Sequence, residues 1–285
     1  MSLLSPALMA RLETLQINSR HRLAGRFGGE HVSTRYGTTV DFSDFREYHP
    51  GDDFRRIDYH VLARLDQVLI KLYEADDEIT VRMLIDTSAS MAVGGKLEQA
   101  KKLAAAIGFV ALTAHDAVTV RTFPERVRAP RFAGRAAVPA LLDSLEDLDA
   151  EGETPFARAA SHLLSQAGLP GITVVISDLL TPEWQSLVGL RASGSDLVVL
   201  HISCEEDETP EYRGDLELVD SEAGDRLTLS VTEDIARSYR VRIAAWRREV
   251  ATITRSAGAT YLPVVSRDDI EDLLLKTWRR AGVLR

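Results

Sequence analysis

Two runs of β-branched and apolar residues constrain the fold of this chain more than any other feature. The runs ITVVISD (172–178) and DLVVLHIS (196–203) contain few polar positions. A strand that is apolar on both faces is typical of a parallel sheet covered by helices on both sides. Strands are also predicted at about 79–86 and 117–123, with helical patterns between the strands. From 79 onward the chain is therefore predicted to form a doubly wound, mostly parallel α/β sheet of Rossmann type, flanked by helices.

The remaining elements follow from periodicity and turn residues. Hydrophobic spacing of three and four residues predicts a helix at 96–114, and a stripe of Ile235, Tyr239, Ile243, Trp246, Val250 and Ile253 predicts another at 232–257. The segment 216–231 reads as a hairpin with EAGD as its turn. Further helices are predicted at 5–17, 137–148, 154–168 and 267–281, with a strand in ERVRAPRFAG beside 117–123 and a last strand at TYLPV.

The first 75 residues have a different character. Residues 20–66 are rich in Gly, Arg, Asp and aromatic residues and show little periodicity, so they are predicted to be irregular. Asp52 or Asp53 is expected to cap a short helix that follows. A strand at about 67–75 is expected to pack this part on the α/β domain. The predicted domains are an N-terminal segment with an edge strand, 1–75, and an α/β domain, 76–285.

Composition excludes several classes of protein. The net charge of −9 argues against a nucleic-acid partner. The only cysteine, Cys204, excludes an internal disulfide framework and a cysteine-rich zinc site, and it is predicted to be a core residue. The longest apolar run, 103–114, is shorter than the roughly 20 residues of a membrane span. The N-terminus lacks the features of a signal peptide. The chain is therefore expected to be soluble and cytoplasmic.

Two predicted strands end in aspartate, at Asp86 and Asp178. Ligands of doubly wound sheets lie beyond the carboxyl ends of the strands, at the topological switch point. Ser88 and Ser90 follow Asp86 in an Asp-x-Ser-x-Ser pattern, and the loop before the 154–168 helix adds the hydroxyl of Thr154. Magnesium prefers such oxygen ligands. These five residues are predicted to form one site for Mg²⁺ or Mn²⁺.

This pattern resembles the metal-ion-dependent adhesion site of von Willebrand factor type A (vWA) domains, over about 79–285. The upstream run also resembles the signature of the bacterial family catalogued as domain of unknown function 58. The residues that carry this second resemblance are Arg46, Tyr48, Pro50, Gly51, Asp52, Asp53, Arg55 and Asp58. Together the two resemblances cover nearly the whole chain.

The resemblance implies roles for the site residues. Ser88 and Ser90 would bind the metal directly, Thr154 directly or through water, and Asp86 and Asp178 largely through water. One coordination position would be left for an acidic group of a protein partner. The family is often encoded beside MoxR-type AAA+ ATPases, which implies an adaptor or chaperone-like role with such an ATPase. The Thr154 loop departs from the common Gly-Gly-Thr-Asp pattern, since it reads Gly-Glu-Thr-Pro here.

Some alternatives remain open. Asp86 and Asp178 are also compatible with a metal-dependent phosphohydrolase, although Ser88 stands where a dehalogenase-like phosphatase needs a second acid. Thr154 is also compatible with a role as a plain helix cap before Pro155. The run from Arg46 to Asp58 can be a structural ion network or a catalytic site. A phosphate loop ending at Lys96 fails, because the first glycine and the final hydroxyl of that motif are missing. No nucleophile and base pair is found, which favours protein binding over catalysis.

Overall fold

The computed structural model describes residues 3–19, 40–49, 54, 57–65, 67–75, 79–124, 131–165, 171–209, 214–222 and 224–285. They divide into two compact units. The larger unit lies within Met1–Ser19 and Ile79–Arg285, and the smaller within Arg20–Glu78. Helix α1 (Pro6–Leu12) therefore belongs to the unit with the α/β sheet, whereas the sequence prediction treats 1–75 as one segment.

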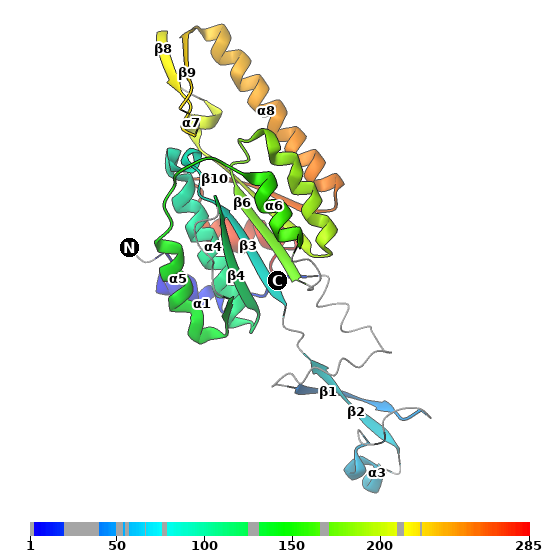
Figure 1. Cartoon of the computed structure of the whole chain (residues 1–285). Coiled ribbons are helices and arrows are strands. Elements are labelled where there is room, and N and C mark those ends of the chain that lie inside the picture. Colours follow the sequence, from blue (N-terminus) through cyan, green and yellow to red (C-terminus); the bar gives the residue numbers. More distant parts are fainter. Residues whose placement is uncertain are drawn as a thin grey trace. The chain divides into compact units, whose positions relative to one another are not determined.

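The larger unit is built on a six-stranded sheet with the order β10-β7-β6-β3-β4-β5. All neighbouring strands are parallel except β5, which is antiparallel to β4. This confirms the predicted α/β class with a mostly parallel sheet, seen in Figure 1. The strands are β3 (Thr80–Asp86), β4 (Ala117–Phe123), β5 (Arg131–Ala133), β6 (Gly171–Ser177), β7 (Asp196–Ser203) and β10 (Thr260–Val265).

Helices cover both faces of this sheet. The elements are α4 (Lys96–Thr113), α5 (Val138–Glu146), α6 (Phe156–Ser165), α7 (Glu205–Glu208), α8 (Glu233–Ser256) and α9 (Ile270–Asp272), with short 3₁₀ segments η2 (Ala89–Gly95), η3 (Arg135–Ala137) and η4 (Pro182–Ser193) and a π-helical turn η5 (Leu273–Trp278). The predicted helix at 96–114 is confirmed as α4. Within the described residues, no helix combines the length and apolar composition that a membrane span needs.

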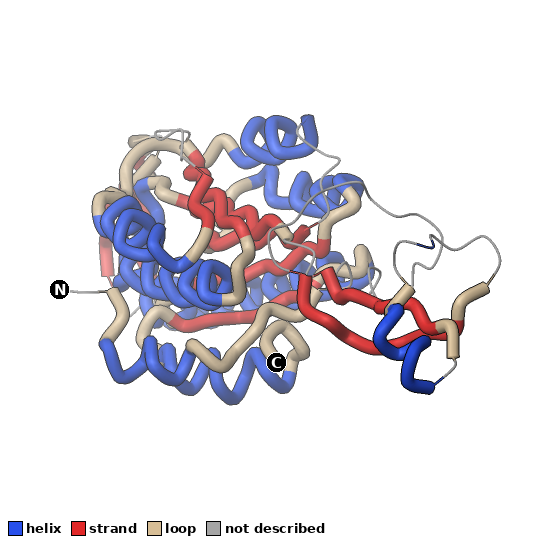
Figure 2. The backbone as a smooth tube through the Cα atoms, turned by 90° about the horizontal axis from the view of Figure 1, so that it is seen from below, coloured by secondary structure: helices blue, strands red, loops and turns tan. Residues whose placement is uncertain are grey.

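Alternate residues of each strand point to opposite faces, which gives the larger unit two apolar cores. In β3, Met83 and Ile85 belong to one cluster and Leu84 to the other. The first cluster includes side chains of α1, α4, α5 and η5, and the second includes side chains of α6, η4 and α8. Figure 2 shows the strands lying between helices. Every residue of β6 is buried, as the apolar run predicts.

A hairpin of β8 (Gly214–Val219) and β9 (Arg226–Val231) lies between β7 and α8 in the chain, as predicted. The predicted apolar stripe of α8 is only partly correct. Val250 is fully buried, but Ile235 and Tyr239 in the first half are 43% and 39% exposed. Figure 1 shows that the first half of α8 extends beyond the sheet.

The smaller unit contains β1 (Val40–Glu47), α3 (Tyr59–Leu65) and β2 (Leu69–Ala75), and β1 pairs with β2 in an antiparallel sheet. The prediction of irregular structure is therefore wrong for β1, whose polar sequence VDFSDFRE hides the strand pattern. The carboxylate of Asp58 accepts hydrogen bonds from the N–H groups of His60 and Val61 and so caps α3. The predicted caps, Asp52 and Asp53, lie outside the described residues.

The turn before α4 depends on two glycines with positive φ, Gly94 (+59°) and Gly95 (+75°). A Cβ at Gly94 would lie 2.4 Å from Cys204 Cβ, whereas a Cβ at Gly95 would meet nothing within 4 Å. Ser266 Oγ also donates a hydrogen bond to the Gly94 carbonyl, at 2.6 Å. Gly94 thus lets the start of α4 approach the end of β7, where Cys204 is buried as predicted.

This difference predicts unequal effects of two similar substitutions. Gly95→Ala should cost about 1 kcal/mol of unfolding free energy, because only the positive φ opposes it. Gly94→Ala has the same strain and also overpacks Cys204, which should add about 1–3 kcal/mol. Urea unfolding of both variants measures the difference. If both variants lose the same unfolding free energy, the contact with Cys204 does not oppose a side chain at position 94.

Candidate functional site

The site forms where β3 and β6 end side by side. These neighbours flank the switch point of the sheet, because the chain continues from β3 through α4 to β4 on one side, while β6 pairs on the other. Ser177, the last residue of β6, donates from Oγ to Asp86 Oδ2 at 2.6 Å. Asp178 follows directly. The structure thus brings the two predicted strand-end acids, Asp86 and Asp178, to one place.

A chain of short hydrogen bonds holds the Asp86 loop. Ser88 donates to Asp86 Oδ1 from its N–H, at 2.9 Å, and from Oγ, at 2.6 Å. The hydroxyl oxygens of Ser88 and Ser90 are 3.0 Å apart. Asp86 and Ser88 are fully buried. Burial, and then the charge of Asp178, raises the pKa of Asp86 to about 7, against the hydrogen bonds from Ser177 and Ser88 that lower it. A nearby cation would favour the charged carboxylate.

The loop that carries Thr154 is tied to the Asp86 loop by its backbone. The Ala89 N–H donates to the Gly152 carbonyl at 2.9 Å, and the Glu151 N–H donates to the Thr87 carbonyl at 2.8 Å. Thr154 is buried, yet its side chain does not point to a neighbour in either loop. Instead, its hydroxyl and N–H both donate to the carboxylate of Glu222, in the turn between β8 and β9.

The role of Thr154 as a plain helix cap finds no support in these contacts. The first turn of α6 is capped by another residue, because the Ala157 N–H donates to Glu183 Oε2 at 3.0 Å. The Thr154 carbonyl accepts from the Phe156 N–H at 2.8 Å, so only its backbone takes part in the turn. Its hydroxyl is directed to a carboxylate instead.

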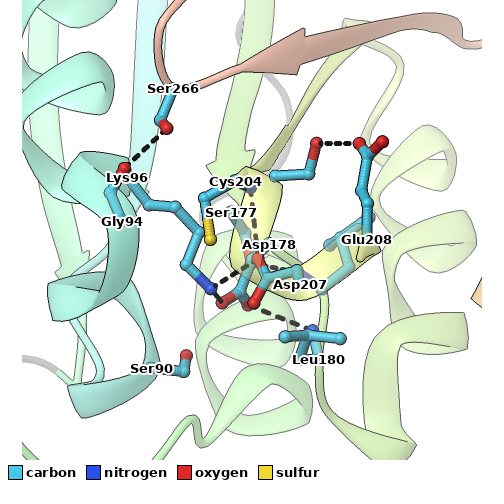
Figure 3. Close-up of polar contacts among 12 residues, drawn as sticks. Ser90, Gly94, Lys96, Ser177, Asp178, Leu180, Cys204, Asp207, Glu208 and Ser266 are labelled. Carbon is cyan, nitrogen blue, oxygen red and sulfur yellow. Dashed lines mark hydrogen bonds and ion pairs between the residues drawn. The ribbon is translucent and has the colours of Figure 1, made fainter. Parts of the chain in front are cut away.

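A buried lysine completes the site. Lys96, the first residue of α4, is 1% exposed and lies between two carboxylates, as Figure 3 shows. Its Nζ is 2.7 Å from Asp178 Oδ2 and 3.0 Å from Asp207 Oδ2. Burial opposes the charge, but the two carboxylates outweigh burial and raise the pKa of Lys96. The other oxygen of Asp178 accepts from the Leu180 N–H, at 3.1 Å.

The oxygen groups can be compared with what a small divalent cation needs. Neighbouring ligands of an octahedral Mg²⁺ lie about 3 Å apart. The hydroxyl oxygens of Ser88 and Ser90 have this separation, 3.0 Å, beside the buried carboxylate of Asp86. Among the described residues, no three His, Cys, Asp or Glu side chains gather in a way that could hold a metal. A cation here would therefore depend on the serine hydroxyls and on water, with Asp178 already balanced by Lys96.

Sequence reasoning missed three residues of this site: Lys96, Asp207 and Glu222. The sequence offers Lys96 only as the end of a phosphate loop whose other residues are missing. The signal that could have found it is its place after Gly-Gly, at the start of a buried helix. Asp207 and Glu222 lie in acidic segments of the kind that is usually exposed to solvent. Nothing in the local sequence distinguishes them from the neighbouring acidic residues. Their positions depend on how the segment after β7 folds back.

The residues of the upstream signature belong to the smaller unit. The Tyr48 N–H donates to the Val68 carbonyl at 2.9 Å, and Asp58 caps α3. The Arg46 guanidinium lies 3.4 Å from His49 Nδ1. Pro50, Gly51, Asp52, Asp53 and Arg55 lie outside the described residues. These contacts of Arg46, Tyr48 and Asp58 all lie within the smaller unit.

Fold and site together define a class: an α/β domain whose parallel sheet carries buried acids and neutral hydroxyls at the carboxyl end of its central strands. Residues 44–250 match the model of the family described as protein of unknown function DUF58. Because this match covers most of the chain, the protein belongs to that family.

Relatives of similar length occur in mycobacteria. The chain is 29% identical to Uncharacterized protein Rv1480 of Mycobacterium tuberculosis and to Uncharacterized protein Mb1516 of Mycobacterium bovis, over 98% of this chain and 92% of each relative. Among solved structures, it is similar to the conserved hypothetical protein BatB from Bacteroides thetaiotaomicron and to an aerotolerance-related membrane protein from Bacteroides fragilis. Both are 16% identical, with TM-scores of 0.43 and 0.42, over 72% of this chain and 98% of theirs. That likeness is too distant to bear on function.

The buried lysine gives a direct test of the charge balance. Lys96→Met keeps the apolar stem but leaves two carboxylates without their cation, so it should lower the unfolding free energy by about 3–5 kcal/mol. Asp178→Asn in the same chain should recover part of that loss, because the two residues interact directly. Chemical denaturation of the single and double variants measures both effects.

Lys101→Met is the matched control for that measurement. Lys101 is also buried on α4, but its partners are the Glu146 carbonyl and the exposed Glu98. Its removal should cost clearly less than that of Lys96. A similar cost for both variants would contradict a special role for the Lys96 ion pairs.

Proposed function

We propose that this protein is a divalent-cation-dependent protein-binding module of the vWA type. Mg²⁺ or Mn²⁺ would be held by Ser88 and Ser90, by Thr154 directly or through water, and by Asp86 and Asp178 largely through water. The observation that carries the proposal is the pair of hydroxyl oxygens, 3.0 Å apart, beside the buried Asp86. When bound, the cation would supply a positive charge that attracts an acidic group of a partner.

Neutral ligands are what make such a cation useful for binding. Each carboxylate in the first coordination shell would cancel part of its charge, whereas a serine hydroxyl leaves the charge available. In this site the hydroxyls of Ser88 and Ser90 are the groups placed together, while Asp178 is occupied by Lys96 and the Leu180 N–H. The arrangement therefore favours capture of an external carboxylate.

The alternative, a phosphohydrolase that uses Asp86 and Asp178, is less compatible with these contacts. A nucleophilic carboxylate needs an oxygen that can reach the phosphorus atom. Asp86 is fully buried, and both of its oxygens already accept hydrogen bonds, from Ser88 and Ser177. Asp178 is 1% exposed and bonded through both oxygens.

The partner in this proposal is a MoxR-type AAA+ ATPase or another protein that presents an acidic group, with the protein acting as an adaptor or in a chaperone-like role. The choice of this ATPase rests on the resemblance described in the sequence analysis, since proteins of that family are often encoded beside such ATPases. The proposal includes a cytoplasmic location, in keeping with such a partner.

The metal site is tested by a variant that disturbs the fold little. Ser90→Ala removes a half-buried hydroxyl whose contact is Ser88 Oγ, so it should weaken Mg²⁺ or Mn²⁺ binding about tenfold or more, which is about 1.4 kcal/mol. Millimolar Mg²⁺ should raise the melting temperature of the wild type by mass action, and this rise should shrink in the variant. Calorimetry with either cation and thermal melts provide the measurements.

Ser161→Ala is the control for this experiment, since Ser161 is an exposed serine of α6 that donates to the Ala157 carbonyl. Its response to the cation should match that of the wild type. If Ser90→Ala binds the cation as the wild type does, the assignment of the site is wrong.

Partner binding should depend on the same groups. A pull-down of a MoxR-type ATPase with the full chain should lose the ATPase when EDTA is added, and Ser90→Ala should retain less of it than Ser161→Ala. Hydrolysis of a generic phosphoester in Mg²⁺, lost in Asp86→Asn, would instead favour the phosphohydrolase.

A further inference from the structure

The carboxylate of Glu222 accepts two hydrogen bonds from Thr154, a residue of the candidate site. Thr154 Oγ1 donates to Glu222 Oε1 at 2.7 Å, and the Thr154 N–H donates to Glu222 Oε2 at 2.9 Å. The two residues are 68 positions apart in the chain. Hydrogen bonds to an ionised acceptor are among the stronger ones in proteins. An acidic side chain of the protein itself therefore binds a residue that is predicted to hold the cation.

Hydrogen bonds to Asp220 stabilise the turn that carries Glu222. The Glu222 N–H donates to Asp220 Oδ1 at 2.7 Å, and the Gly224 N–H donates to the Asp220 carbonyl at 3.0 Å. The pair Val219 and Arg226 closes the ladder of β8 and β9 next to the turn. These contacts hold the backbone of Glu222 next to the end of the β8–β9 ladder.

We propose that Glu222 is an internal carboxylate ligand of the Thr154 site, and that an acidic partner binds only when the hairpin turn leaves. The proposal rests on the proposed function and adds its regulation. The hairpin turn supplies the same chemical group, a carboxylate, that the partner would bring. A partner carboxylate bound to the cation beside Thr154 would take the place that the Glu222 carboxylate holds, so binding of the partner and docking of the hairpin are mutually exclusive.

The hairpin of β8 and β9 buries little apolar surface, so its undocking from Thr154 should cost little free energy. Most residues of β8 and β9 are exposed, and Leu218, Val219 and Leu227 are 42%, 54% and 62% exposed. Segments with few buried apolar contacts open at low free-energy cost. While docked, an internal ligand acts at an effective concentration of about millimolar. Free carboxylates that bind more weakly than this would not displace Glu222, whereas a protein partner with further contacts would.

The contact itself is tested by amide exchange in the full chain. Glu222→Gln keeps the size of the side chain but removes the charge, and it should speed hydrogen exchange of the Thr154 amide about tenfold, since that N–H donates to the carboxylate. Glu217→Gln is the matched control: it lies in β8 of the same hairpin and pairs with Arg226. It should leave Thr154 exchange unchanged. Unchanged exchange in Glu222→Gln would overturn the proposal.

Competition is tested with a peptide of residues 220–225, DSEAGD, added in trans to the wild type and to the two variants in Mg²⁺. The peptide should bind Glu222→Gln about tenfold more tightly than the wild type or Glu217→Gln, because the variant leaves the site open more often. A peptide with Gln in place of its glutamate should not bind. Equal binding of DSEAGD to all three proteins would overturn the competition.

Two further measurements separate possible failures. Glu222→Ala, with exchange of the β6 amides as a check of the fold, replaces Glu222→Gln if that variant is unstable. The melting temperature of each protein is recorded with and without Mg²⁺. A normal Mg²⁺ response together with unchanged Thr154 exchange would reject the internal ligand alone. Faster exchange without any Mg²⁺ response in the wild type would reject the metal-dependent function and leave the Glu222 contact in place.

Discussion

The parallel pairing of β3 with β6 is the constraint on which the rest of the site depends. Because the two strands run in the same direction and adjacent to each other, the acids that follow them emerge at one edge of the sheet. The Ser177 hydroxyl joins the two strand ends by its bond to Asp86. The register pairs Ile85 with Ile176, so Asp86 and Ser177 are the next residues of the two strands.

Charge balance decides what the site can do. Asp178 and Asp207 share the ammonium of Lys96, while Asp86 is bonded to serine hydroxyls and lacks such a lysine in the described part of the chain. Burial makes this division costly to alter, because an unpaired charge inside a protein is strongly unfavourable. The acid that remains is the one beside Ser88 and Ser90. This division of charge is the basis of the proposal that hydroxyls hold a cation there and that the ligand brings its own negative charge.

The segment after β7 adds a second layer to this edge. It supplies α7, whose Asp207 holds Lys96, and the hairpin turn, whose Glu222 holds Thr154. Figure 1 shows the hairpin and the first half of α8 extending beyond the sheet. Ile235 and Tyr239 are exposed in that half of α8, so the apolar stripe that the sequence predicts does not mark a core there. The sheet thus positions the site residues, and an exposed segment contacts one of them, Thr154, through Glu222.

The sequence alone determined the class of fold, the order of most strands and helices, and the residues Asp86, Ser88, Ser90, Thr154 and Asp178 as a group to examine. Local patterns suffice for these, because strand and helix periodicity and the residues at strand ends are properties of short segments. Only the tertiary structure decided that Lys96 lies between Asp178 and Asp207 and that Glu222 binds Thr154. Those contacts join residues far apart in the chain, and their geometry depends on how whole elements pack, which no short segment encodes.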